Sequence, residues 1–216
     1  MPLKVKICGL INKDSVITSI NGGASYCGFI LNYPKSHRYI YDISKILYLN
    51  KINRKKCKLV AVLVNPTNAD LNKLKPINFD YFQLHGEESA ERIKEIKINH
   101  KIKIIKTIKI KKKNDINNYL QYQNIVDLFL FDSYGFEKSK KFNHSWLKSL
   151  SDSDIHWMLA GKIGIDNLEK VAKIAKIIDV SGSLEVNKKK DNKKITNFLN
   201  KVKKINYENK KKYSPN

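Results

Sequence analysis

The chain has 216 residues, and its 42% hydrophobic and 10% aromatic content is enough for one folded domain with a substantial core. A formal net charge of +22 suggests nucleic-acid binding, but arginine occurs only at Arg38, Arg54 and Arg92 and the lysines are spread along the chain, so we expect no specific nucleic acid as a partner. No apolar run comes near the length of about 18 residues that a membrane-spanning helix needs. No basic, apolar leader precedes the first strand. We therefore expect a cytoplasmic protein without membrane contact.

Strand-like and helix-like segments alternate along the chain. Short apolar runs rich in β-branched residues predict strands at 4–10, 26–31, 59–64, 81–84, 102–110, 126–131, 157–159 and 177–180. Apolar residues at helical spacing, some behind a capping residue such as Asn12 or Asp166, predict helices at 12–20, 43–49, 69–74, 87–96, 114–123, 143–150, 166–176 and 190–202. In the strand at 102–110 lysine alternates with isoleucine, which is typical of a half-exposed strand.

The order of these segments predicts the fold. Eight strand-then-helix units without a long insertion indicate an α/β fold, a single (β/α)8 TIM barrel over residues 1–204. The lysine-rich residues 205–216 are predicted to form a frayed tail. An open doubly wound sheet is the alternative, but it usually has fewer strands and often a glycine fingerprint after the first one, where this chain reads ICGLIN.

In a barrel of this kind the carboxyl ends of the strands face the active site. The residues at the predicted strand ends are Cys8, Asn65, Gln83, His85, Asp132, Gly161 and Ser181. Cys8 is the best catalytic candidate, because it ends a buried run and precedes a glycine, although a free cysteine is more often a small buried hydrophobe. The three cysteines are odd in number and lack the spacing of metal ligands, so we expect neither a disulfide framework nor a metal site.

Seven segments carry a resemblance to a known family. In chain order they read KVKICGL, KSHRYI, VAVLVN, FQLHGEE, LFLFDS, LAGKIGIDNLEKV and DVSGSLE. Together they resemble the phosphoribosylanthranilate isomerase family from Lys4 to about Asp191. The resemblance implies a TIM barrel that performs an Amadori rearrangement in tryptophan biosynthesis. It would convert N-(5-phosphoribosyl)anthranilate, a small phosphorylated substrate, to the carboxyphenylamino-deoxyribulose phosphate without cofactor or metal.

The resemblance also implies roles for individual residues. Asp132 would protonate the furanose oxygen as general acid, and Cys8 as thiolate would remove the proton from the adjacent carbon. Arg38 would pair with the anthranilate carboxylate, for which a planar guanidinium is suited. The remaining substrate-binding residues would be Gln83 and His85 in the pocket and, around the phosphate, Gly161, Lys162, Ser181, Gly182 and Ser183.

The chain departs from the family pattern mainly where glycine is usual. Lys162 replaces one of two paired glycines, Ser181-Gly182-Ser183 stands where serine, serine, glycine is usual, and Gly135 is the glycine left in SYGFEKSKKFN after Asp132. His37 replaces a common proline before Arg38. Two alternatives to an active isomerase therefore stay open: a family member with lost or changed activity, and a basic binding protein on a barrel scaffold. The chain is expected to be a monomer or a homodimer.

Overall fold

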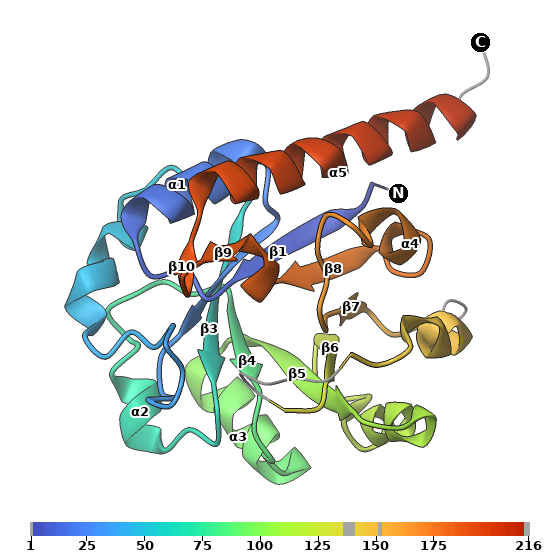
Figure 1. Ribbon diagram of the computed structural model, residues 1–216. Coiled ribbons are helices and arrows are strands. Elements are labelled where there is room, and N and C mark those ends of the chain that lie inside the picture. The colour runs from blue at the N-terminus through green and yellow to red at the C-terminus, as the bar shows by residue number, and fades with distance from the viewer. Residues whose placement is uncertain (1, 136–140, 151–152, 214–216) are drawn as a thin grey trace.

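The computed structural model describes residues 2–135, 141–150 and 153–213. Eight parallel strands close into a barrel in chain order, and helices surround it (Figure 1). The strands are β1 Lys4–Cys8, β2 Tyr26–Ile30, β3 Lys58–Leu63, β4 Tyr81–Leu84, β5 Lys103–Ile110, β6 Leu128–Ser133, β7 Trp157–Leu159 and β8 Ile177–Val180. Because β1 pairs with both β2 and β8, no open edge remains in the sheet. The predicted TIM barrel is confirmed, and the open doubly wound sheet is excluded.

The connections are helical but vary in type. The described residues form five α-helices: α1 Lys13–Gly22, α2 Asn68–Asn72, α3 Ala90–His100, α4 Leu168–Ala172 and α5 Asn192–Tyr213. The same part of the chain forms four 3₁₀ helices: η1 Ile43–Asn50, η2 Lys113–Tyr122, η3 His144–Leu150 and η4 Gly182–Leu184. A short hairpin, β9 Glu185–Val186 and β10 Lys189–Lys190, precedes α5. Three predicted α-helices are therefore the tighter 3₁₀ form, which apolar spacing over so few residues does not distinguish from an α-helix.

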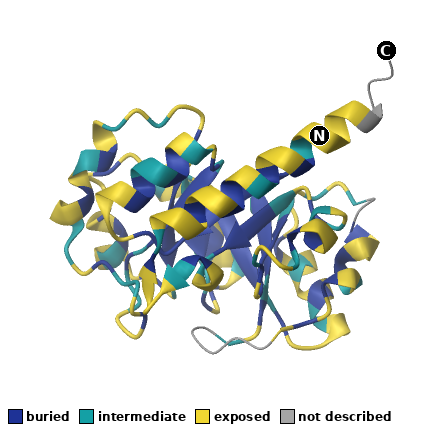
Figure 2. Ribbon diagram, turned by 45° about the horizontal axis from the view of Figure 1, so that its top comes forward, coloured by how far each residue is buried: buried dark blue, intermediate teal, exposed yellow. Residues whose placement is uncertain are grey.

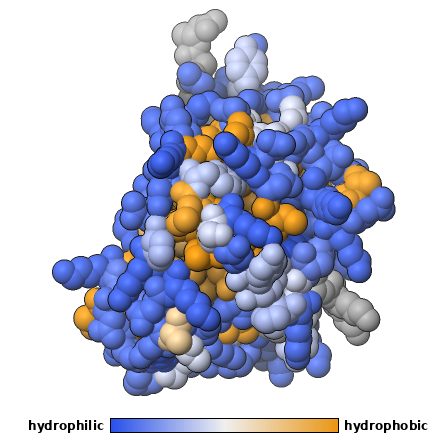
Figure 3. Space-filling view, turned by 90° about the vertical axis from the view of Figure 1, so that its left-hand side faces the viewer, coloured by the Kyte–Doolittle hydropathy of each residue, from blue (hydrophilic) through white to orange (hydrophobic). Residues whose placement is uncertain are grey.

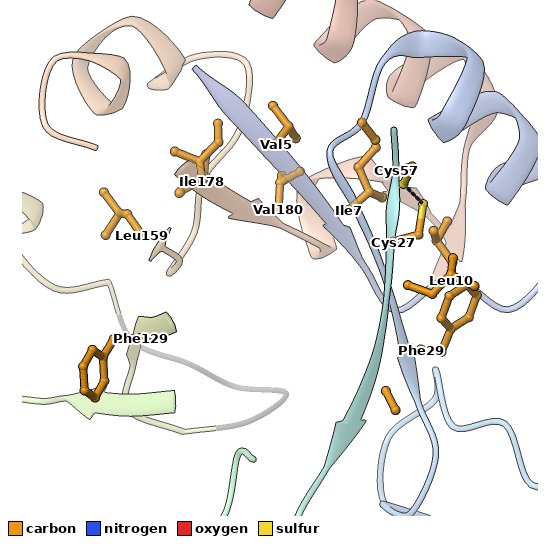
Figure 4. Packing of buried hydrophobic residues seen from close by; sticks show 14 of the residues in the cluster. Val5, Ile7, Leu10, Cys27, Phe29, Cys57, Phe129, Leu159, Ile178 and Val180 are labelled. Atoms are coloured by element: carbon orange, nitrogen blue, oxygen red, sulfur yellow. Dashed lines mark hydrogen bonds between the residues drawn. The ribbon is translucent and has the colours of Figure 1, made fainter. Parts of the chain in front are cut away.

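The core has two layers because strand side chains alternate between the two faces of the sheet. Outward-facing residues pack between the barrel and its helices, among them Ile7, Phe29 and Val180 (Figure 4). Inward-facing residues such as Val60 and Leu130 fill the barrel itself. In Figure 2 the strands form a buried centre and the exposed positions lie mainly on the surrounding helices and loops. Among the described residues, no helix is long and apolar enough to cross a membrane.

Of the lysines of β5, Lys103 is exposed and Lys109 is half-buried, but Lys106 is buried, contrary to the expectation of a half-exposed strand. The Lys106 ammonium donates to Glu88 Oε2 at 2.7 Å and to the Gly86 carbonyl at 2.8 Å. The aliphatic stem lies in the outer layer while the charge is neutralised by the loop after β4. Because the lysines of β5 lie three residues apart, they fall on both faces of the barrel wall and do not separate a buried face from an exposed one.

The ends of two predicted helices are corrected by the structure. Helix α4 begins at Leu168, and Asp166 does not cap it. The tail prediction is wrong for 205–213, because α5 continues through Tyr213 and residues 214–216 lie outside the described part. Ile205 is buried, and the Asn206 side chain accepts from the Leu3 amide at 2.7 Å and donates to its carbonyl at 3.1 Å. These contacts with the start of the chain hold the helix beyond the expected boundary.

Candidate active site

A cavity of about 720 Å³ opens at the carboxyl ends of the strands. All ten residues predicted for the site line it: Cys8, Arg38, Gln83, His85, Asp132, Gly161, Lys162, Ser181, Gly182 and Ser183. Asn65 does not line it, because its side chain accepts from the Glu87 amide at 2.7 Å and so stabilises the loop after β4. Figure 3 shows a face of the molecule on which hydrophobic residues gather near the middle within a border of hydrophilic side chains. The fold thus brings together residues that are far apart in sequence.

The Cys8 thiol lies at the carboxyl end of β1 and is 8% exposed. The residue opposite it on β2 is Gly28, where a Cβ would lie 3.0 Å from Cys8 Sγ and 3.1 Å from Lys6 Cε. Glycine at this position therefore makes room for the thiol and the lysine side by side. Burial raises the pKa of Cys8, while the Lys6 ammonium acts in the opposite direction.

Lys6 and Asp179 are functional-site residues that the sequence reasoning did not identify. Lys6 Nζ lies 3.1 Å from Asp179 Oδ1, and both side chains are buried inside the barrel next to Cys8. The signal that could have found them is the polar residue inside each of two apolar strands, KVKIC and IIDV, because a buried charge needs a partner of opposite sign. Their separation of 173 positions hides the pairing until the barrel is closed.

Asp132 lies near the end of β6, with Oδ1 accepting from the Ser133 amide at 2.7 Å. Burial, with the nearby Asp179 carboxylate, raises the pKa of Asp132 from 3.8 to about 7. A carboxyl in this environment still carries a proton near neutral pH, which the general-acid role requires.

His85 stands beside this carboxyl, with Nε2 3.9 Å from Asp132 Oδ2. Burial lowers the pKa of His85 to about 3, and the Lys109 charge acts in the same direction, so the ring is neutral at physiological pH. Its Nδ1 lies 3.2 Å from Gln83 Nε2 and 3.3 Å from Thr107 Oγ1. These contacts fix the orientation of the ring at the cavity wall, as expected for a residue that lines the pocket.

The Arg38 guanidinium lies over Gly9 at the edge of the cavity. Gly9 has φ +74°, and a Cβ there would come 2.2 Å from Arg38 Cδ, so a side chain is excluded by both conformation and space. Arg38 donates from Nε and Nη2 to the two carboxylate oxygens of Glu185 at 2.6 and 2.9 Å. Glu185 also accepts from the buried Lys190, and although burial raises its pKa, the hydrogen bonds from Arg38 and Lys190 hold that pKa at about 2. With this low pKa, Glu185 stays ionised at physiological pH, and its carboxylate holds the Arg38 guanidinium in place.

The loops after β7 and β8 are joined to each other. Ser183 Oγ donates to the Ile163 carbonyl at 2.6 Å, while Asn167 accepts from the Gly164 amide and donates to the Lys162 carbonyl. Lys162 has φ +52°, so this position does require the left-handed region. Ser183, which stands where the family usually has glycine, is outside that region, so the serine causes no backbone strain there. Of the segment after Asp132, residues 136–140 lie outside the described part.

Comparisons with known proteins agree with this geometry. The model of the family described as N-(5'-phosphoribosyl)anthranilate (PRA) isomerase matches residues 5–201. This chain belongs to that family. The N-(5'-phosphoribosyl)anthranilate isomerase of Rhizobium johnstonii is 34% identical over 215 residues, covering 94% of this chain and 95% of that protein. The resemblance and the enzyme class inferred from the sequence are confirmed.

Solved structures of the family show the same barrel. The phosphoribosyl anthranilate isomerase of Thermotoga maritima is 27% identical, with a TM-score of 0.82 over 94% of this chain and 99% of that one. A phosphoribosyl anthranilate isomerase in complex with reduced 1-(o-carboxyphenylamino)-1-deoxyribulose 5-phosphate is also 27% identical, with a TM-score of 0.80 and the same coverage. That relative therefore holds a phosphorylated analogue on a barrel that superposes on this one.

Proposed function

We propose that this chain converts N-(5-phosphoribosyl)anthranilate to 1-(2-carboxyphenylamino)-1-deoxyribulose 5-phosphate, with Asp132 as general acid and Cys8 as general base. The observation that carries the proposal is the presence, in one cavity, of a carboxyl with a pKa of about 7 and a thiol in contact with a lysine. Family membership supports the reaction. The conversion is an internal rearrangement that needs proton transfers and no net redox change.

The acid step opens the ribose ring. Protonated Asp132 donates to the furanose oxygen, the bond from that oxygen to the anomeric carbon breaks, and the anthranilate nitrogen forms an iminium. Neutral His85 stands beside the carboxyl and adds no positive charge that would favour loss of its proton. The raised pKa of Asp132 therefore suits a group that must be neutral before the reaction and charged after it.

The base step removes a proton from the carbon next to the iminium. Cys8 accepts that proton as a thiolate from β1, while Asp132 acts from β6, a strand that is not its neighbour. The resulting enolamine relaxes to the ketone product.

The anthranilate carboxylate and the phosphate, which are the two charged ends of the substrate, are proposed to bind at different parts of the cavity. Glu185 holds Arg38 through Nε and Nη2, and the guanidinium fixed in this way is proposed to bind the anthranilate carboxylate. The phosphate is proposed to lie between the loops after β7 and β8, which line the cavity with Gly161, Gly164 and Gly182. There the Lys162 ammonium would add a point charge to the backbone amides.

The proposal also covers metal ions, cellular location and oligomeric state. Among the described residues, no group of three or more His, Cys, Asp or Glu side chains is arranged to hold a metal ion. All three cysteines are free thiols, which suits the proposed cytoplasmic location. A relative from Thermotoga maritima, 27% identical, is described as a dimeric isomerase, so a homodimer is one of the two expected states of this chain.

Two assays test the proposal. The chain should restore growth without tryptophan to a bacterium that lacks the isomerase, and the purified protein should convert the phosphoribosyl substrate to the ribulose product. The Asp132→Asn variant, expressed to the same level, is the control for growth by any other route. Failure of the folded wild-type chain in both assays would overturn the proposal and favour a changed activity.

A further inference from the structure

The Lys6 side chain stands inside the barrel between a thiol and a carboxylate. Its Nζ is 3.1 Å from Asp179 Oδ1, and it lies fully buried on the same face of β1 as Cys8. A Cβ at Gly28 would come 3.0 Å from Cys8 Sγ and 3.2 Å from Lys6 Nζ. The absence of a side chain at Gly28 is therefore what lets the ammonium and the sulfur share one space.

We infer that Lys6 is the residue that makes Cys8 a working base, by providing the positive charge that stabilises its thiolate, and that Asp179 moderates this effect. The inference deepens the proposed function and rests on it. Lys6 contacts the thiol and does not line the cavity, so it is a positioning residue. Its role explains why a lysine occupies the barrel interior, where an apolar residue would cost nothing in desolvation.

The charged groups around the thiol are few. Lys6 on β1 and Lys190 on β10 favour the thiolate, whereas Asp179 on β8 disfavours it. Asp132 on β6 feels the same Lys6 and Asp179 charges, so the acid and the base share one local field. In a buried site such charges are poorly screened, and one unit of pKa corresponds to a tenfold change in the thiolate fraction.

The arrangement gives effects of opposite sign for its two members. Without the lysine, a thiolate would lie beside the Asp179 carboxylate with no cation between them, so the thiol should hold its proton to higher pH. Without the carboxylate charge, Lys6 has the thiolate as its remaining counterion, so the thiol should lose its proton at lower pH. A purely structural ion pair would give the same loss of packing in both variants.

The test is the rate at which iodoacetamide alkylates Cys8, followed from pH 6 to pH 10 without substrate and assigned by mass spectrometry of the Cys8 peptide. Lys6→Met should slow alkylation at pH 7.5 by about tenfold or more and move the profile to higher pH. Asp179→Asn should speed it and move the profile to lower pH. Lys106→Met is the matched control, since it removes another buried, ion-paired lysine from the outer layer, and it should leave the Cys8 profile unchanged.

Equal alkylation in Lys6→Met and wild type, or shifts of the same sign in the Lys6 and Asp179 variants, would overturn the inference. If Lys6→Met does not fold, the sign of the Asp179→Asn shift still decides, because a structural role predicts no gain in reactivity. The readout needs no isomerase activity. Opposite shifts in a chain that does not turn over the substrate would support the inference while refuting the proposed function, and unchanged profiles in an active chain would do the reverse.

Discussion

The cavity has a floor and a rim that are built on different principles. The floor consists of Cys8, Asp132 and Asp179, which are held on strands inside the barrel, together with Lys6, which lies buried beside Cys8 and Asp179. The rim consists of the loops 161–164 and 181–183, which would bind phosphate largely through their backbone. The charges of Lys6 and Asp179 are buried and poorly screened, whereas Lys162 on the rim is exposed to water and salt.

This difference explains where the chain departs from its family's pattern. A substitution on the floor changes the charge seen by every neighbouring titratable group, so few residue types fit there. On the rim the bound anion meets several backbone amides, and one altered residue removes or adds only a part of the interaction. Substitutions at the two places should therefore differ in size and in the kinetic constant that they change.

The largest effect is expected on the floor. Cys8→Ala and Asp132→Asn should each reduce kcat by at least about 100-fold, because each removes a group that is proposed to transfer a proton. Steady-state kinetics with N-(5-phosphoribosyl)anthranilate measures this. Cys57→Ala, which removes a buried thiol outside the cavity, is the control. Retention of most activity in either floor variant would remove that residue from the mechanism.

A smaller effect, mainly on KM, is expected at Arg38. Arg38→Ala should raise KM by roughly 10- to 100-fold, which corresponds to the about 1.5–3 kcal/mol of a hydrogen bond to a charged group. Arg38→Lys should recover little of this, because an ammonium cannot bind Glu185 in two places and present further donors to the substrate at once. An unchanged KM in Arg38→Ala would exclude the carboxylate role.

The Asp132 carboxyl should also make activity and stability depend on pH. As the pH rises through about 7, Asp132 loses its proton while the thiolate fraction of Cys8 still grows, so turnover should rise with pH up to about 7 and then level off. Since the pKa of Asp132 is raised from 3.8 to about 7 on folding, the free energy of unfolding is highest below the unfolded pKa, falls progressively as the pH rises to about 7, and stays at the lower value above it.

Asp132→Asn separates these two consequences. It stays neutral, so it should unfold at a higher temperature than wild type at pH 8.5, by roughly 2–4 °C per kcal/mol gained, and at nearly the same temperature at pH 4. Thermal unfolding at the two pH values measures this. If wild type and Asp132→Asn unfolded at the same temperature at both pH values, burial would not destabilise the Asp132 carboxylate. The floor would then not differ from the rim in this respect.

The smallest effects are expected on the rim at Lys162. If the ammonium binds phosphate, Lys162→Gly and Lys162→Ala should both raise KM severalfold and weaken binding of inorganic phosphate, with effects that fade as salt rises. If Lys162 is only tolerated at φ +52°, Lys162→Gly should improve affinity by relieving strain of roughly 1–2 kcal/mol, and Lys162→Ala should do little. We expect the first result. Unaltered phosphate affinity in Lys162→Gly would refute both.

The sequence predicts the barrel well because each strand is short, apolar and followed by a helical spacing. Strand ends then select six of the ten predicted residues that line the cavity, whereas Arg38, Lys162, Gly182 and Ser183 come from the family resemblance. What it does not provide is the partner of a buried charge. Lys106 in an alternating strand looks exposed, although Glu88 neutralises it in the outer layer. Lys6 is hidden for the same reason, because Asp179 becomes its neighbour only through the closure of β1 on β8.

Local boundaries depend on contacts that the sequence also conceals. Asp166 has the residue type of a helix cap, but Asn167 uses its side chain to bridge the loop after β7 and the helix begins at Leu168. Residues 205–213 have the composition of a tail, yet Asn206 binds the backbone of Leu3 and the helix persists. In both cases a side chain finds a partner outside its own segment.

The pairing of β1 with β8 has a consequence for synthesis on the ribosome. Cys8 and Lys6 belong to the first strand that is made, whereas Asp179 belongs to β8, the last strand of the barrel. Until that strand has left the ribosome, the sheet has two open edges and the lysine has no carboxylate beside it. A growing or prematurely ended chain thus presents its thiol without the surroundings that the finished barrel supplies, and the site comes into being in a single late step.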